Sequence, residues 1–415
     1  QAAGTDNGAG LIYTGVDLNF GNATDTTATF VMNYPDAGQI QLHALYTLVP
    51  SGETMIGASN DFVSRPFGFV LDAAGNPAAA DATGAVYTTA GSAFTVNASA
   101  ALWNSVDDDL LGLSDGVPDN HDDNDPANND DLSNNSVTLG GINYIGAPNF
   151  GQENEDLILS SILDQPAPGV NPGLSGTPQI TAFVNGAGSS ANVRFLEVGI
   201  IEIGAGILDN DYLGLGLLET ATMVSKSGYV GRFRPASFAL SNINNGTFAN
   251  TCTIGATPFT YIGQDFGYTT APGFRVTARN ELLGTTQNYR GPFVKLNGTS
   301  ALVAVTNDSS VSGTDANPLT VSYTQTPMTF IPDNIGNIDY TFSLTDSFRY
   351  GPASNLLAYS KEANSEVSLF TADIDPLLNQ VSDGEVTTAF AQAFDITGNE
   401  QRFGRVRMSN VHGSE

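Results

Sequence analysis

Apolar and polar residues alternate along most of the chain, in short runs separated by Gly, Pro, Asn and Asp. The first 60 residues contain three such runs, at 11–20, 27–34 and 39–49. A period of two residues predicts antiparallel strands that bury one face. Only 355–366 and 386–394 are candidates for short helices. The pattern therefore predicts an all-β fold of tandem immunoglobulin-like β-sandwich domains with long loop insertions.

Proline junctions and polar stretches divide the chain into four expected domains. Residues 1–61 supply too few strands for a sandwich of about seven, so its first strands are expected to be missing or supplied by another chain. Residues 62–231 are expected to form a sandwich with an acidic insertion. A second sandwich is predicted for 232–318, and a β-rich domain for 319–415, continuing beyond the chain end.

The acidic insertion, residues 103–131, contains ten of the 43 acidic residues and no Lys or Arg. Like-charge repulsion makes such a loop costly unless it stays solvated or binds a hard cation. Oxygen ligands on a turn with Gly and Asn suit Ca²⁺, although the spacing departs from the EF-hand loop. A solvated acidic loop without metal is the alternative. The predicted Ca²⁺ ligands are Asp107, Asp109, Asp115, Asp119, Asp123 and Asp125.

The amino-acid composition limits which classes of partner the protein can bind. With 43 acidic and 14 basic residues, the net charge is −29 and the sequence pI about 4.1. Without a basic patch, nucleic acid and anionic lipid surfaces are poor partners, whereas cations and neutral glycans remain. No apolar run approaches the roughly 20 residues of a spanning helix. Few lysines and many Gly, Asn, Thr, Ser and Ala residues favour an extracellular protein.

The sequence gives little indication of an enzyme active site. Glu197 and Glu202 flank an apolar run, but five residues along a strand place them on opposite faces, roughly 16 Å apart, beyond a glycosidase pair at about 5 to 9 Å. The run GLSDG (112–116) has the GxSxG spacing, but no helix is predicted after it, as a nucleophile elbow requires, and no phosphate-binding glycine motif occurs. We therefore predict a protein that is not an enzyme.

Arginines and aromatic residues in 232–293 permit two interpretations. The arginines would form ion pairs with carboxylates or capture an acidic glycan. The aromatic residues would pack in the core or stack on a sugar. The residues concerned are Arg232, Arg234, Arg275, Arg279, Arg290, Tyr261, Phe266, Tyr289 and Phe293.

An ordered series of motifs covers nearly the whole chain: RPFGF (65–69), DDDLLGLSDGVPDN (107–120), PNFGQE (148–153), VGRFRPASFAL (230–240), ARNELLGTTQNYRG (278–291) and RFGRVRMSNVHGSE (402–415). This series resembles the surface-protein family of the mannose-sensitive haemagglutinin (MSHA) pilus biogenesis protein MshQ. The resemblance implies a secreted, β-rich protein of Gram-negative bacteria that is associated with a pilus or the cell surface. It also implies that a partner for Cys252 lies outside this chain, and it carries over no catalytic residues.

These observations together predict an extracellular, calcium-stabilised, adhesin-like protein. Its expected partners are pilus or cell-surface components, with glycans and self-assembly as further candidates. The alternative is a structural subunit of an extracellular filament assembled by β-strand exchange, because an incomplete first sandwich leaves an open edge.

Overall fold

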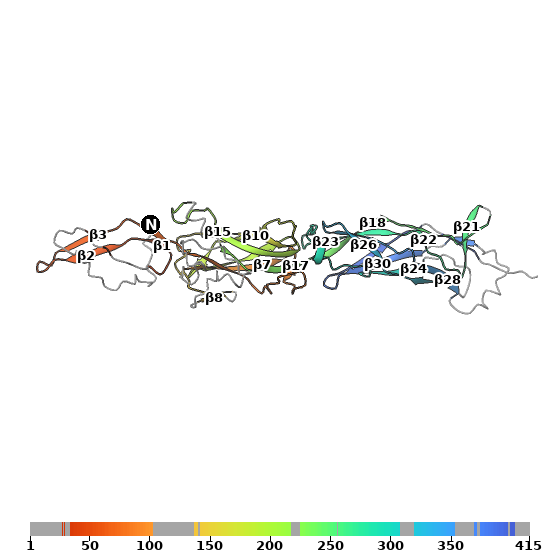
Figure 1. Ribbon diagram of the computed structural model, residues 1–415, viewed down its shortest axis with the longest axis horizontal. Helices are drawn as coiled ribbons and strands as arrows, with labels where there is room; N and C mark the ends of the chain where they lie inside the picture. Colours follow the sequence, from red (N-terminus) through yellow and green to blue (C-terminus); the bar gives the residue numbers. More distant parts are fainter. Residues whose placement is uncertain are drawn as a thin grey trace, which may run out of the picture. The chain divides into compact units, whose positions relative to one another are not determined.

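The computed structural model describes residues 27, 29, 34–102, 137–139, 142–216, 225–254, 256–307, 319–352, 369–371, 374–396 and 399–402 (Figure 1). Apart from one turn of 3₁₀ helix, η1 (Gly291–Phe293), every regular element in these residues is a β-strand. The chain divides into two compact units, residues 1–234 and 235–415. In each unit antiparallel sheets pack face to face, so the predicted class of tandem immunoglobulin-like β-sandwiches is confirmed.

Unit 1 contains two main sheets that pack against each other. The first has the order β11-β14-β7-β5, with β13 beside β14. Its strands are β11 (Leu174–Gly176), β14 (Ala187–Phe195), β7 (Ala93–Ala101), β5 (Gly68–Ala73) and β13 (Phe183–Val184).

The second sheet has the order β12-β10-β15-β17-β6, with β16 beside β15. Its strands are β12 (Gln179–Ile180), β10 (Leu157–Gln165), β15 (Gly199–Ile207), β17 (Val230–Arg234), β6 (Thr88–Thr89) and β16 (Ser225–Lys226). All pairings are antiparallel except that of β17 with β6. A separate short ladder joins β8 (Val137–Leu139) to β9 (Ile142–Tyr144).

The core of unit 1 lies between these two sheets. On β7 the side chains of Phe94, Val96 and Ala98 are buried, with half-buried residues between them. Phe233, from β17 of the opposite sheet, lies with its ring 5.6 Å from that of Phe94 and 5.3 Å from that of Phe195. The alternating pattern of β7 is thus satisfied by a second layer of side chains.

Unit 2 contains one four-stranded sheet and several smaller ones. The four-stranded order is β18-β23-β27-β26, formed by β18 (Ser237–Asn244), β23 (Gly273–Arg279), β27 (Asn337–Thr341) and β26 (Thr329–Pro332). A three-stranded sheet contains β24 (Ala301–Asn307), β30 (Ile374–Ser382) and β31 (Thr387–Ala393).

The remaining strands of unit 2 form short ladders. β19 (Thr247–Phe248) pairs with β22 (Tyr268–Thr270), and β25 (Leu319–Thr324) with β28 (Ser347–Pro352). A further sheet has the order β20-β21-β32-β29, with β20 (Cys252–Ile254), β21 (Thr257–Tyr261), β32 (Glu400–Arg402) and β29 (Leu369–Thr371). Because β23 pairs with β27 and β24 with β30, the segments 232–318 and 319–415 share sheets.

Aromatic rings dominate the core of unit 2. Phe274 on β23 stacks on Tyr340 of β27 with ring centroids 5.1 Å apart. Its ring also lies 5.8 Å from that of Phe394, which follows β31 in the three-stranded sheet. These contacts join the two sheets through their apolar faces.

Residues 386–394, a candidate helix by sequence, form strand β31 instead, and 355–366 lies outside the described residues. The strand pairs with β30 from Leu377↔Ala393 to Ser382↔Thr387. Val386 and Phe394 are buried at its two ends. Tertiary pairing therefore overrides the helix propensity of the three alanines in this segment.

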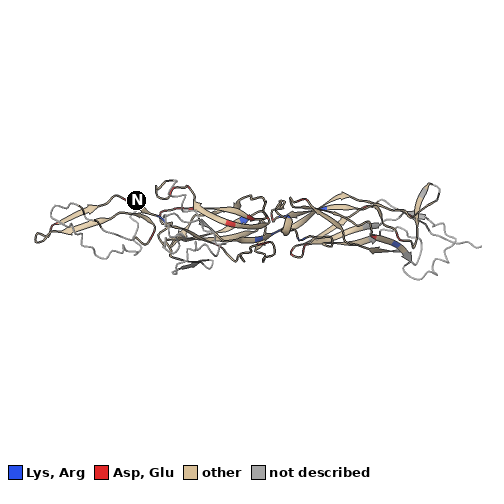
Figure 2. Cartoon of the chain, in the orientation of Figure 1, with Lys and Arg blue, Asp and Glu red and all other residues tan. Residues whose placement is uncertain are grey.

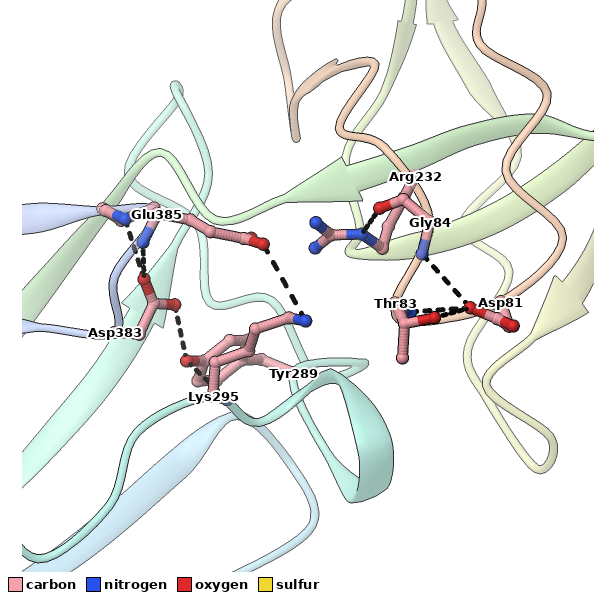
Figure 3. A network of polar contacts seen from close by, with 9 residues as sticks. Asp81, Thr83, Gly84, Arg232, Tyr289, Lys295, Asp383 and Glu385 are labelled. Atoms are coloured by element: carbon pink, nitrogen blue, oxygen red, sulfur yellow. Dashed lines mark hydrogen bonds and ion pairs between the residues drawn. The ribbon is translucent and has the colours of Figure 1, made fainter.

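A buried tyrosine fixes the loop after β23 to the turn between β30 and β31 (left half of Figure 3). The Tyr289 hydroxyl donates to Asp383 Oδ2 over 2.8 Å and accepts from the backbone N–H of Lys295. Asp383 Oδ1 in turn accepts from the N–H of Val386 at 2.7 Å. Burial raises the pKa of Tyr289, and the charge of Asp383 adds to the rise. The hydroxyl therefore stays a donor at neutral pH.

In unit 1, a comparable polar contact holds the loop before β6 (right half of Figure 3). The buried Arg232 side chain donates from Nε to the Gly84 carbonyl over 3.0 Å. Asp81 Oδ1 accepts from the N–H groups of Thr83 and Gly84 and closes the turn. These contacts connect the 81–84 turn to β17 within the same sandwich.

Candidate functional site: an exposed apolar hairpin

A long hairpin extends the chain before the sandwich of unit 1. Strand β1 (Gly38–Ile40) pairs with β4 (Phe62–Ser64), and beyond them β2 (His43–Thr47) pairs with β3 (Thr54–Ala58). We call residues 38–64 the hairpin arm. Its strands β2 and β3 belong to a sheet of only these two strands in the described part of the chain (Figure 1).

The root of the arm is fixed to the sandwich by a buried carboxylate. Asp36 is fully buried, and its Oδ1 accepts from the N–H of Ala37 at 2.8 Å and from that of Asn149 at 3.0 Å. Ser64, at the other strand of the root, donates its hydroxyl to the Asp36 carbonyl over 2.8 Å. Ala37 belongs to the apolar core of unit 1. The arm therefore begins on a well-packed base.

The distal half of the arm is exposed on both faces. All ten residues of β2 and β3 are exposed. Leu45 and Ile56, a cross-strand pair, expose 69% and 75% of their surfaces, and the next pair, Tyr46 and Met55, 63% and 61%. Because neighbouring positions point to opposite faces, each face carries one apolar pair. The expected single buried face of 39–49 is therefore wrong for β2, since no second layer covers it among the described residues.

The arm is also free of charge where it is most apolar. Neither β2 nor β3 contains Asp, Glu, Lys or Arg (Figure 2). The nearest acidic residues are Glu53 in the turn and Asp61 near the root. Edge strands are usually protected by charges, prolines or a covering element. An apolar hairpin without these features is suited to protein contact by side-chain burial or by strand pairing.

The six predicted Ca²⁺ ligands, Asp107 to Asp125, lie outside the described residues. Within the part that the structure describes, no group of three or more His, Cys, Asp or Glu side chains is arranged to hold a metal ion. Cys252 is a free thiol there, half-buried on β20. The structure thus leaves the calcium hypothesis resting on the sequence of 103–131.

An acidic group lies near the turn that follows β15. The Tyr212 hydroxyl donates to Glu153 Oε1, and Asp209 and Asp211 lie in the turn itself. Burial raises the pKa of Glu155, and a hydrogen bond from the Leu213 backbone partly opposes this rise. Three neighbouring negative charges raise the pKa further, those of Asp209, Glu153 and Asp211. The ionised form of the Glu155 carboxyl is therefore destabilised in the folded protein, which makes stability depend on pH.

The arginines mostly bind protein groups. Arg275 forms a bidentate pair with Asp339 across β23 and β27, at 2.6 and 2.9 Å. Arg279 donates to the Leu283 carbonyl, and Arg290 to the Asn334 carbonyl. These contacts favour the structural interpretation over glycan capture.

The aromatic residues of 232–293 are mostly core residues. Phe266, Tyr289 and Phe293 are buried, whereas Tyr261 is exposed on β21. The core interpretation is therefore confirmed for three of these four aromatic residues. The exposed aromatic residue of the arm, Tyr46, gave no separate signal because it lies within an ordinary alternating run.

Two family models match the sequence. The second domain of DUF6701 matches residues 65–193, and the third domain of DUF6701 matches residues 197–403. The border between the two matches, residues 194–196, lies at the end of β14 and before β15, inside the sandwich of unit 1. No curated protein matches the chain.

Solved structures with some likeness include InvD of Yersinia pseudotuberculosis, at 10% identity and a TM-score of 0.21, covering 83% of this chain and 86% of that one. Another is the set of cadherin-like domains 1 to 4 of zebrafish RET, at 10% identity and a TM-score of 0.21. That match covers 65% of this chain and 46% of the RET chain. No helix in the described residues is long and apolar enough to cross a membrane.

Proposed function

Since the chain belongs to the DUF6701 family, we propose from its own residues that it is an extracellular, non-enzymatic surface protein that acts as an adhesin. Its partners would be pilus or cell-surface components of the kind that the resemblance to MshQ implies, or neutral glycans. A strongly acidic chain has no attraction for nucleic acid or anionic lipid.

The observation that carries this proposal is the exposed apolar hairpin arm on a fixed root. A contiguous exposed apolar patch on a protein often marks an interaction site, whereas single exposed apolar residues do not. A contact residue on a rigid base loses little conformational entropy when it binds, which favours affinity. The arm meets both conditions through Tyr46 and Met55 on one face and Asp36 at the root.

Adhesion by bacteria that display the full chain tests the proposal. A strain lacking the protein is complemented with the wild type, with Y46S/M55S, or with F330S/I331S, which removes exposed apolar side chains from β26 of unit 2. We expect adhesion to be lost without the protein, reduced in Y46S/M55S and retained in F330S/I331S. Equal adhesion by the deletion strain and the wild type would contradict the function.

Calcium stabilisation is the second part of the proposal. Ca²⁺ bound by the acidic loop only in the folded state would stabilise it by about 2.7 kcal/mol when free Ca²⁺ is 100 times the Kd. The D119N/D123N variant should lose the rise in Tm on adding Ca²⁺. If the rise persists in that variant, the ligand assignment is wrong.

A structural subunit of an extracellular filament, assembled by strand exchange, is the second candidate. In the described residues the outer edges of β2 and β3 are unpaired, which favours this candidate because such edges accept strands from other chains. Electron microscopy of the concentrated protein tests this candidate. Fibres support it, and dispersed particles at all concentrations contradict it.

A further inference from the structure

We propose that the hairpin arm pairs with the arm of a second copy of this chain, β2 against β2, around a two-fold axis at Leu45. The product is a closed dimer with the strand order β3-β2-β2-β3. The inference does not depend on what the protein adheres to, because it concerns a contact between two identical arms.

The backbone of β2 is arranged for this pairing. Ser59 donates its N–H to the Leu42 carbonyl at 2.9 Å, and Leu48 donates to the Glu53 carbonyl at 2.7 Å. In an antiparallel hairpin these bonded positions alternate with positions whose N–H and C=O groups point away from the partner strand. His43, Leu45 and Thr47 are the outward-pointing positions, and no strand in the described residues pairs with that edge.

A two-fold axis at Leu45 brings these same positions opposite one another. Leu45 then faces Leu45 of the second copy, and His43 faces Thr47 in both directions. All three are hydrogen-bonded pairs in the resulting ladder, so every outward N–H and C=O from His43 to Thr47 finds a partner. The strand is therefore complementary to itself without any change of register.

The side chains reinforce this register. Ile56 lies opposite Leu45 within each arm, so the four-stranded sheet carries an unbroken row of Ile56, Leu45, Leu45 and Ile56 on one face. Cross-strand apolar pairs are the unit of sheet stabilisation. On the other face the large Tyr46 faces the small Ala44 of the second copy, which avoids a clash.

Charge favours the β2 edge over the β3 edge as a meeting point of two copies. Two copies that each carry a net charge of −29 repel one another, so they can approach only where both are neutral. Residues 41–49 contain no Asp, Glu, Lys or Arg, whereas β3 is directly preceded by Glu53 in the turn. The β2 edge is thus the better neutral surface on the arm.

The contact is small. An exposed aliphatic side chain offers roughly 60–120 Å² of apolar surface, so the interface between the arms is smaller than the roughly 1,200 Å² at which stable specific interfaces begin. We therefore expect a reversible dimer that dissociates in the micromolar range.

Sedimentation equilibrium of the full chain over a range of concentrations measures this dimer directly. The L45K variant places two like charges at the two-fold axis and should weaken dimerisation at least about tenfold. The matched control is I331K, because Ile331 is 65% exposed on the edge strand β26 of unit 2. This control should dimerise like the wild type.

Disulfide trapping then tests the register, in a background where Cys252 is replaced by Ser. Facing Leu45 positions lie about 5.5 Å apart between Cα atoms, which suits a disulfide. L45C should therefore be trapped as a dimer on mild oxidation. V49C is the control: Val49 is exposed, but the two copies of it would lie roughly 27 Å apart at 3.4 Å per residue.

Four results would overturn the inference. A protein that stays monomeric at all concentrations rules the dimer out. A dimer unaffected by L45K places the contact elsewhere. Equal trapping of L45C and V49C contradicts the proposed register, in which Leu45 faces Leu45. Open-ended oligomers in place of dimers contradict the two-fold axis and favour strand exchange into filaments.

Discussion

Strands β7 and β2 of unit 1 both lie in runs of alternating apolar and polar residues, interrupted in β2 by Leu45, but they have different surroundings. On β7, Phe94 and Val96 face a second sheet and are buried, with Phe233 across the sandwich. On β2, Leu45 and Tyr46 face no second layer in the described residues and are exposed. Alternation therefore predicts a strand, whereas burial depends on whether another sheet is present to cover it.

Within unit 1, the residues that stabilise the fold are therefore different from the residues that can contact a partner. Residues of the sandwich contribute to the free energy of unfolding, and residues of the distal arm are available to partners. Each substitution in the sandwich therefore has a natural control in the arm.

The largest effect is expected from F233A. Its fully buried ring contacts Tyr87, Phe94 and Phe195, and losing such a side chain costs about 3–5 kcal/mol. Chemical denaturation followed by circular dichroism should show this loss. I56A in the arm should change the free energy of unfolding by less than about 0.5 kcal/mol. Similar losses at both positions would mean that the arm is part of the core.

G186A should be the next most destabilising. Gly186 has a φ of +75°, and an added Cβ would lie 2.2 Å from the Ala147 carbonyl oxygen. Backbone strain of this kind costs about 1–3 kcal/mol before any clash is counted. The matched variant G57A in β3 meets nothing within 4 Å and should unfold like the wild type. Thermal unfolding of the two variants side by side measures the difference.

Y289F in unit 2 should cost about 1.5–3 kcal/mol, the contribution of a hydrogen bond to a charged group. It removes the donor to Asp383 while leaving the buried ring in place. Y46F, which removes the hydroxyl of an exposed ring in the arm, is its control. A Y289F protein as stable as the wild type would show that Asp383 gains another donor.

The smallest effect concerns pH. The pKa of Glu155 is raised in the folded state, mainly by burial, so folding favours the protonated form. The resulting stability is complete below the unfolded pKa of about 4.3 and is lost as the pH rises through the folded pKa. E155Q should therefore raise the Tm slightly at neutral pH and lose this advantage near pH 4. E53Q, in the turn of the arm, is the matched substitution for comparison.

The local sequence was sufficient to predict individual strands but not to predict which strands pair with one another. The alternating run 39–49 identified β2 without structural information, because a period of two is a local property. Residues 386–394 were mistaken for a helix because pairing with β30 is not visible in composition. The sharing of sheets across residue 318 depends on contacts between distant residues, such as Arg275 with Asp339.

The candidate site was predicted only in part. An open edge in the first 60 residues followed from counting strands, but its place on β2 and β3 required knowing which strand edges are unpaired in the described residues. The role of Asp36 in the root also lay beyond reach, since its partner Asn149 is 113 residues away. The calcium ligands of 103–131 stay a prediction.

The pairing of β17 has a mechanical consequence when tension is applied to the chain. This last strand of unit 1 pairs antiparallel with β15 on one side and parallel with β6 on the other. Tension applied through residue 234 pulls β17 along its own axis, so the bonds of both ladders are loaded together instead of opening one after another. The sandwich is thereby expected to resist a steady pull at this end.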